Sequence, residues 1–192
     1  KHIIKKFFPT NKKIKIIDFG CGFGDFIRLM HKEGYKNALG VDDSEGMINE
    51  GKRLKIKNLI KSNVFTYIKK LPSNSIDIIT AIDLIEHIEK ENLSQLVAQI
   101  HRVLKNHGKL ISQQPNGANP FVNSILYGDF THEHAFTKGS ISQLLFSNGF
   151  DDVQVYEVKP IIHGFKSLLR YLLWTLIVKN ILLLMSFPET GV

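Results

Sequence analysis

Short apolar runs alternate with amphipathic stretches along most of the chain. The apolar runs are rich in Ile, Leu and Val and have the length of strands, whereas the stretches between them place apolar residues at helical spacing. The predicted strands cover residues 15–19, 37–42, 59–62, 76–81 and 109–113. The predicted helices cover 25–33, 47–52, 91–104 and 140–147. This alternation predicts an α/β protein with a doubly wound, mostly parallel sheet and helices on both faces, which binds ligands outside the carboxyl ends of its strands.

The first predicted strand ends in an acid followed by three alternate glycines. Gly20, Gly22 and Gly24 allow a sharp turn and a close approach of backbone to a ligand. A dinucleotide-binding loop has the spacing G-x-G-x-x-G and holds a pyrophosphate. Here the spacing is G-x-G-x-G, and Asp18 would repel a pyrophosphate but suits a ligand that carries an ammonium and a sulfonium.

The run from residue 16 to 24, together with Asp42 about twenty residues later, resembles motif I of the class I S-adenosylmethionine-dependent methyltransferases. The order of the later segments resembles the same family over residues 14–115 and implies a Rossmann-like sheet. In the family pattern Asp42 accepts from both ribose hydroxyls and Met47 packs against adenine. Many relatives have an acid where this chain has Asn63, whose carbonyl oxygen can still accept from the adenine amino group. The cofactor-binding residues implied by the resemblance are Asp18, Gly20, Cys21, Gly22, Gly24, Asp42, Asp43, Met47, Asn63, Val64 and Asp83.

Histidines near the ends of the later strands are the candidates for chemistry. Transfer of a methyl group to a hydroxyl requires removal of a proton, and imidazole titrates near neutral pH. The catalytic candidates are therefore His132, His134 and His87. The His-x-His spacing also admits a divalent metal, but two ligands without a third do not establish a site, so no metal ligand is predicted. The structural alternative is a histidine that bonds backbone and anchors a loop.

Residues 114–137 are predicted to form a lid over the acceptor. From Asn116 to Thr137 the sequence also resembles methyltransferases encoded among bacterial surface-polysaccharide genes, which implies a saccharide or glycan precursor as the acceptor. Residues 80–83 lack the Asn/Asp-Pro-Pro-aromatic signature of enzymes that methylate amino groups of nucleic acids, so nucleic acid is disfavoured. An RNA methyltransferase and a non-catalytic cofactor-binding subunit remain the alternatives.

The chain of 192 residues has a net charge of +7 and one cysteine. The charge excess begins with an N-terminal run of lysines. The favoured interpretation is a solvated helix that leads into the first strand, and the alternative is a basic arm that meets phosphate, nucleic acid or anionic lipid. A lone Cys21 excludes an intramolecular disulfide and suits a reducing compartment, which indicates a cytoplasmic protein.

The predicted domain covers residues 1–160, and residues 161–192 form an apolar helical extension. Basic and polar residues interrupt its apolar stretch, 165–187, so a spanning helix is not predicted. Burial against another domain or in a homodimer is the favoured interpretation, and peripheral contact with the inner membrane face is the other. Residues 152–158 are predicted to form a sixth strand, and the family's seventh strand is expected to be missing from this chain.

Overall fold

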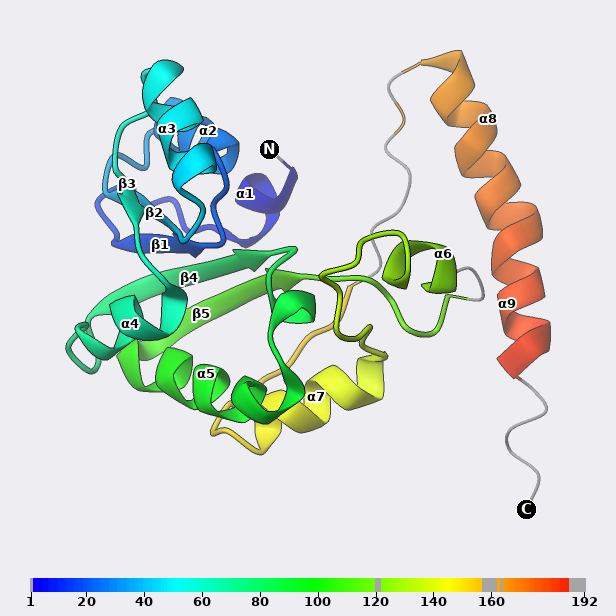
Figure 1. Cartoon of the computed structure of the whole chain (residues 1–192). Helices are drawn as coiled ribbons and strands as arrows, with labels where there is room; N and C mark the ends of the chain where they lie inside the picture. Colours follow the sequence, from blue (N-terminus) through cyan, green and yellow to red (C-terminus); the bar gives the residue numbers. More distant parts are fainter. Residues whose placement is uncertain (1, 120–121, 157–161, 163, 187–192) are drawn as a thin grey trace.

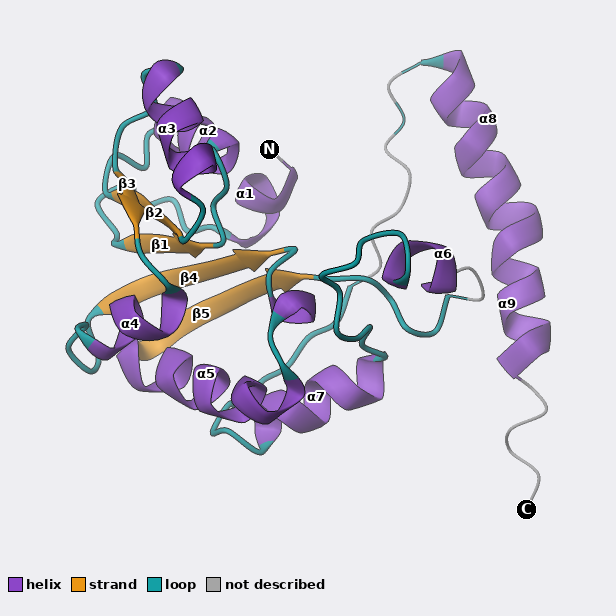
Figure 2. Cartoon of the chain, viewed as in Figure 1, coloured by secondary structure: helices purple, strands orange, loops and turns teal. Residues whose placement is uncertain are grey.

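A five-stranded parallel sheet with the order β3-β2-β1-β4-β5 lies at the centre of the computed structural model, which describes residues 2–119, 122–156, 162 and 164–186 (Figures 1 and 2). All four strand pairings are parallel. The strands are β1 (Ile16–Phe19), β2 (Ala38–Asp42), β3 (Leu59–Lys61), β4 (Ile76–Ile82) and β5 (Leu104–Gln113). The order reverses between β1 and β4, which is the point where doubly wound folds bind ligands. The predicted fold class is confirmed.

Helices cover both faces of the sheet because successive strand residues point to opposite sides. Ile16 packs in one apolar cluster with residues of α2 (Asp25–Lys32) and α3 (Glu45–Arg53). The adjacent Ile17 packs in a second cluster with α4 (Val64–Lys69) and α5 (Lys90–Val103). Both faces of β1 are therefore buried, as its continuous apolar run predicts.

The remaining helices surround this centre. They are α1 (His2–Phe7), the short 3₁₀ helix η1 (Ile85–His87), α6 (Val122–Leu126), α7 (Lys138–Phe146), α8 (Phe165–Leu173), the π-helical segment η2 (Trp174–Val178) and α9 (Lys179–Ser186). The predicted lysine-rich lead-in helix corresponds to α1. Helix α4 follows β3 and was not predicted, because its six residues are too few to show a helical period.

The last strand begins earlier than its sequence predicts. His107 and Gly108 lie between the predicted helix (91–104) and the predicted strand (109–113) and have the residue types of a turn, but α5 ends at Val103 and β5 begins at the next residue. Leu104 already pairs with Ile76, and the next pair is Lys109 with Ile78. A register shift in the pairing of β4 with β5 accommodates the extra residues of β5 between these two pairs. The turn signal at His107, which has a φ of +64°, therefore marks an irregularity inside the strand.

The prediction of a sixth strand was wrong for the residues that the structure describes. Residues 152–156 form no strand, and residues 157 and 158 lie outside the described part of the chain.

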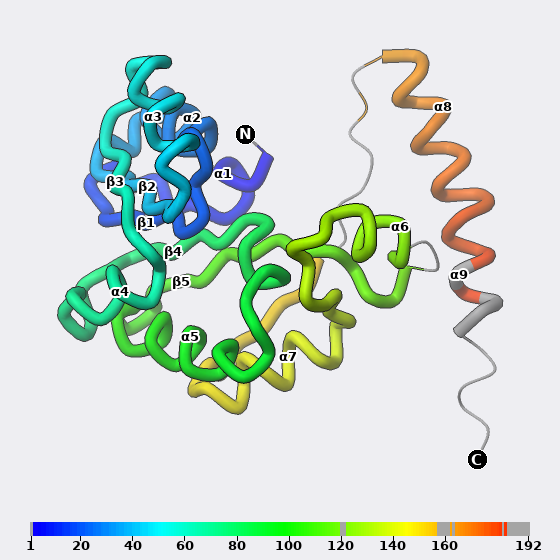
Figure 3. The backbone as a smooth tube through the Cα atoms, in the orientation of Figure 1, coloured from blue at the N-terminus to red at the C-terminus, as the bar shows by residue number. Residues whose placement is uncertain are grey.

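The helix from α8 to α9 stands apart from the sheet and its covering helices (Figure 3). None of its described side chains is buried, and large apolar residues such as Leu176 (65% exposed) and Leu183 (58%) face outward. Within the described residues, no helix combines the length and the apolarity needed to cross a membrane. The homodimer and peripheral-membrane interpretations of this segment stay predictions.

Candidate functional site

The glycine-rich loop leaves the carboxyl end of β1 in an unusual backbone conformation. Gly20, Gly22 and Gly24 have φ values of +70°, +54° and +89°, in the left-handed region that glycine adopts without strain. The backbone N–H groups of Gly20 and Cys21 both donate to the carbonyl oxygen of Val41, over 2.9 and 3.2 Å. These bonds fix the loop against the end of β2.

Asp42 at the end of β2 holds the loop from the other side. Its Oδ2 accepts from the backbone N–H of Gly22 over 2.8 Å, and its Oδ1 accepts from that of Ser44 over 2.9 Å. Each carboxylate oxygen has a second acceptor position. Asp42 therefore positions the loop and still has capacity for two ligand hydroxyls, which fits its predicted ribose role.

The space around the three glycines differs. A Cβ on Gly22 would meet nothing within 4 Å, whereas a Cβ on Gly20 would lie 3.0 Å from Leu84 Cδ1 and one on Gly24 would lie 2.7 Å from Leu59 Cδ2. At the two outer glycines, the positive φ and the neighbouring leucines both disfavour a side chain. The middle one faces open space beside Asp42, where a ligand can approach the backbone.

Asp18 is buried directly beneath this loop. Its side chain is 3% exposed, and its Oδ1 accepts from Thr80 Oγ1 over 2.5 Å. Burial raises the pKa of the Asp18 carboxyl to about 7; the Thr80 bond opposes the rise and the Asp42 charge adds to it. A cationic ligand beside the loop would favour the ionised form, so the site fits a sulfonium and an ammonium.

The Cys21 side chain has a packing role. A Cβ on Gly40 would lie only 2.6 Å from Cys21 Sγ, which shows how closely the thiol packs on β2. Burial, together with the charges of Asp18 and Asp42, raises the pKa of the thiol to about 12. A thiol that stays protonated is a poor nucleophile. If Cys21 contacts the cofactor as predicted, we therefore expect its backbone to make the contact and not its thiol.

The residues predicted on the adenosine side lie at two helix starts. Asp43 is exposed, and Met47, in the first turn of α3, is 47% exposed. The Asn63 Oδ1 accepts from the Phe65 backbone N–H over 2.9 Å and so caps α4, while Val64 is buried. The amide oxygen that was predicted to meet adenine is therefore already used once, with one acceptor position left.

At the carboxyl end of β4 the chain turns sharply. Asp83 is exposed and has a φ of +49°, and its backbone N–H donates to Gln113 on β5. Leu84 packs over Gly20, and η1 then buries Glu86 to 1% exposure and half-buries His87. Burial raises the pKa of the Glu86 carboxyl.

The predicted lid returns to this turn. Asn116 and Phe136 form an isolated bridge, and the Glu133 backbone N–H donates to the carbonyl oxygen of Glu86 over 2.8 Å. These contacts bring His132 against His87, with 4.7 Å between the ring centroids. Two of the three catalytic candidates thus lie together, although 45 residues separate them in the sequence.

His134 lies apart from this pair. Its ring packs edge-on against Phe136 with 5.0 Å between centroids, and its Nε2 is buried without a partner among the described residues. Burial lowers the pKa of His134, which the charge of Glu133 and the carbonyl of Ile85 oppose. The role of His134 as a base stays a prediction, and its surroundings resemble those of a packing residue.

Two residues near the histidines were not among the predicted site residues. Thr131 Oγ1 donates to Asp129 Oδ1 over 2.7 Å and lies 2.9 Å from His87 Nδ1. The second residue is Glu86, which adjoins His87 in the sequence. The adjacency of Glu86 to a candidate histidine was a visible signal, whereas only the folded lid reveals the contact of Thr131.

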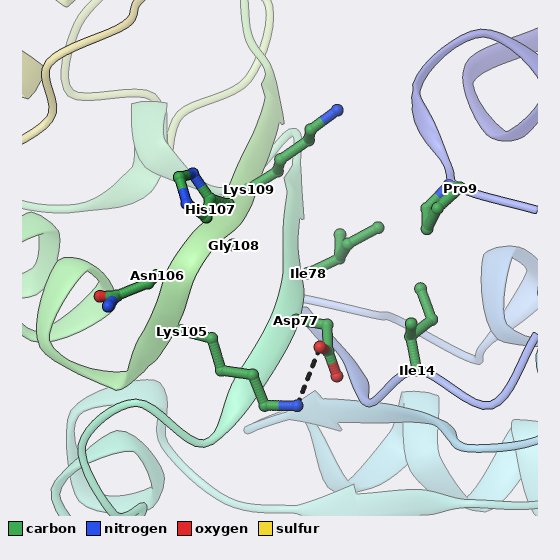
Figure 4. Close-up of a pocket in the computed structure, with 9 residues that line it drawn as sticks. All are labelled: Pro9, Ile14, Asp77, Ile78, Lys105, Asn106, His107, Gly108 and Lys109. Atoms are coloured by element: carbon green, nitrogen blue, oxygen red, sulfur yellow. Dashed lines mark hydrogen bonds and ion pairs between the residues drawn. The ribbon is translucent and has the colours of Figure 1, made fainter. Parts of the chain in front are cut away.

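A shallow hollow at the opposite end of the sheet has no part in this site. Its volume is about 170 Å³, and Figure 4 shows Lys105 paired with Asp77 among the residues that line it. Lys105 and Asp77 lie near the amino ends of β5 and β4, and parallel α/β sheets bind ligands at the other edge.

Comparisons with known proteins agree with the geometry. A family model described as a methyltransferase domain matches residues 1–155. A SAM-dependent methyltransferase structure from Archaeoglobus fulgidus is 28% identical with a TM-score of 0.71, over 80% of this chain and 68% of that chain. Phosphoethanolamine N-methyltransferase 2 from Haemonchus contortus, in complex with phosphomonomethylethanolamine and S-adenosylhomocysteine, is 24% identical with a TM-score of 0.66, over 79% of this chain and 36% of that chain.

Curated relatives extend beyond the segment that they share with this chain. An uncharacterized protein of Methanocaldococcus jannaschii is 30% identical over 134 residues, which cover 69% of this chain and 54% of that protein. The chain spans about half the length of the curated relatives it matches. The family match, the sheet order and the acid-flanked glycine loop lead to one assignment. The chain belongs to the class I S-adenosylmethionine-dependent methyltransferases.

Proposed function

We propose that this protein transfers the methyl group of S-adenosylmethionine to a hydroxyl oxygen of a small polar acceptor, namely a saccharide or glycan precursor. The observation that carries the proposal is the pair of carboxylates at the glycine loop, Asp42, which accepts from the Gly22 N–H, and Asp18, which is buried in the strand that leads into the loop. One carboxylate is buried where a cation would favour its charge, and the other has free acceptor positions for a diol.

When bound, S-adenosylmethionine supplies a methyl carbon on a positively charged sulfur. The chain then has to hold the acceptor hydroxyl in line with that carbon and to accept its proton. His87 and His132 are the bases that the geometry favours, because both are half-buried at the carboxyl end of β4 and form one group. The O–C bond forms as the C–S bond breaks, and the proton passes to a ring nitrogen.

Exposed aromatic residues in the lid support a sugar acceptor. The side chain of Tyr127 is 80% exposed and that of Phe130 is fully exposed, in the segment between α6 and His132. Aromatic rings bury the apolar faces of ligands, and a tyrosine also offers a hydroxyl to polar groups. The Haemonchus enzyme has a phosphorylated amine in its complex, so acceptors differ within the fold.

The first test is calorimetric titration with S-adenosylmethionine and S-adenosylhomocysteine. We expect binding by the wild type and none by Asp42→Ala. An acceptor screen with a labelled methyl donor and nucleotide sugars, glycans and RNA follows. Labelled saccharide supports the proposal, and labelled RNA contradicts its acceptor class.

The assignment of the base has its own test. Once an acceptor is found, His132→Ala should lower kcat by roughly 10²- to 10⁴-fold, and unchanged turnover would remove His132 as the base. Cofactor binding without transfer to any acceptor would favour a non-catalytic subunit.

A further inference from the structure

Three side chains from two distant segments meet beside η1. Glu86, His87 and His132 each offer one potential ligand atom, and these three atoms lie within 4.8 Å of one another. The first two residues belong to η1 and the third to the lid, which the bond from the Glu133 N–H to the Glu86 carbonyl holds in place.

The surroundings of His87 fix which ring nitrogen carries its proton. Its Nδ1 lies 3.2 Å from the carbonyl oxygen of Thr131, which can only accept. It also lies 2.9 Å from Thr131 Oγ1, whose own hydrogen is donated to Asp129. The Nδ1 of His87 must therefore be the donor in both contacts. In the neutral ring, Nε2 is then left with a free lone pair.

His132 is fixed in the same tautomer. Its Nδ1 lies 3.0 Å from the carbonyl oxygen of Ile125, so Nδ1 carries the proton and Nε2 has the lone pair. Histidines that bind metals usually donate their second ring N–H to a carbonyl or another oxygen, because this bond orients the ring and sets its tautomer. Both histidines already have that outer partner.

Glu86 supplies the independent observation. The residue is 1% exposed, and its Oε2 has no hydrogen-bond partner among the described residues. A buried carboxylate oxygen without a partner is costly, so such atoms are rare in folded proteins. A carboxylate oxygen of Glu86 also belongs to the group of three potential ligand atoms that includes one nitrogen of each histidine.

We propose that Glu86, His87 and His132 bind one divalent transition-metal ion, with Zn²⁺ as the reference ion. Two imidazoles and one carboxylate form a ligand set of catalytic zinc sites, which keep a further position open. In a tetrahedral site with bonds of about 2.1 Å, ligand atoms lie roughly 3.4 Å apart. The present spacing of up to 4.8 Å exceeds this value by about 1.4 Å at most.

Metal binding does not rest on the proposed function, but the role of the ion does. The acceptor hydroxyl would bind at the open position, where the ion lowers its pKa and the proton leaves to water. The resulting alkoxide oxygen would bond to the methyl carbon while the C–S electron pair returns to sulfur. With the ion bound, this route would replace the histidine base of the proposed function, because a ring nitrogen that binds the ion cannot also take the proton, and the methyl transfer itself would be unchanged.

The test uses the untagged full chain, freed of metal with a chelator and then titrated with Zn²⁺ and with Co²⁺. We expect one equivalent of each ion to bind, with a Co²⁺ visible spectrum typical of nitrogen and oxygen ligands in low coordination. Glu86→Gln keeps the shape of the side chain and removes its charge, while His132→Ala removes a ligand from the lid. Each substitution should weaken metal binding by more than roughly 10- to 100-fold, which is the loss that follows removal of a residue that only hydrogen-bonds to a metal ligand.

The matched control is His101→Gln, which removes an exposed histidine of α5 outside the cluster. It should bind both ions as the wild type does. Wild-type protein that binds neither ion, or variants that bind as tightly as wild type, would overturn the proposal. Titration of the same samples with S-adenosylmethionine checks their folding. Asp42→Ala should lose the cofactor and keep the metal, so the two proposals can fail separately.

Discussion

The raised pKa of Asp18 makes cofactor binding depend on pH. Without a ligand, burial holds the pKa of this carboxyl at about 7, so it changes charge within the physiological range. A cationic cofactor beside the glycine loop binds the ionised form more tightly than the neutral form. Binding should therefore release a proton at neutral pH, and the affinity should rise as the pH increases through 7.

The magnitude follows from the pKa. With a pKa of about 7, roughly a tenth of the protein has ionised Asp18 at pH 6 and about nine tenths at pH 8. If only the ionised form binds, affinity falls about tenfold from pH 8 to pH 6, equivalent to roughly 1.4 kcal/mol.

The same pKa also makes the stability of the ligand-free protein depend on pH. Its contribution to the free energy of unfolding is fully present below the unfolded pKa of about 3.9 and is lost as the pH rises through 7.

Calorimetric titration with S-adenosylmethionine from pH 6 to pH 8, in buffers of different ionisation enthalpy, measures both the affinity and the released proton. Asp18→Asn should bind the cofactor more weakly, and its affinity should not show the change near pH 7. Any pH dependence that remains in this variant comes from titration of the ligand itself. Thr80→Val removes the bond that lowers the pKa of Asp18, so the change in affinity should move to higher pH. Equal pH profiles for wild type and Asp18→Asn would refute the reasoning.

Three further substitutions test the site. Asp42→Ala should abolish cofactor binding and lower the free energy of unfolding by about 1–3 kcal/mol, because two backbone N–H groups lose their acceptor. Chemical denaturation measures the free energy of unfolding. The control Asp43→Ala should reduce cofactor affinity and stability less than Asp42→Ala does. Gly24→Ala should lower the free energy of unfolding by more than about 1 kcal/mol, because the backbone has a positive φ here and the new Cβ would contact Leu59. A melting temperature equal to that of the wild type would contradict this prediction. Asn63→Ala should lower the free energy of unfolding by about 1 kcal/mol because the α4 cap is lost, whereas Asn63→Ser keeps a capping oxygen. If Asn63→Ser has the stability of the wild type but a weaker affinity for the cofactor, the Asn63 amide contacts the cofactor.

Local patterns carried much of the prediction. The apolar run before Asp18 predicted β1, because a strand buried on both faces is apolar at every position. The glycines at 20, 22 and 24 predicted a left-handed turn, which the structure has at all three. The position of β5 was harder to predict, since pairing of Leu104 with Ile76 overrides the turn signal at His107 and Gly108.

The sequence by itself determined the sheet, the glycine loop and the family, because each depends on neighbouring residues or on the order of segments. Only the tertiary structure decided which histidines act together. His132 and His134 share a short motif, yet the lid turns the first toward His87 and packs the second against Phe136. The structure also gave the Asn63 oxygen to the start of α4 and left Glu86 buried beside two imidazoles. The contact of His87 with His132 joins residues far apart in the chain, which no spacing rule in a single sequence encodes, whereas the Asn63 cap is a local signal that depended on knowing where α4 begins.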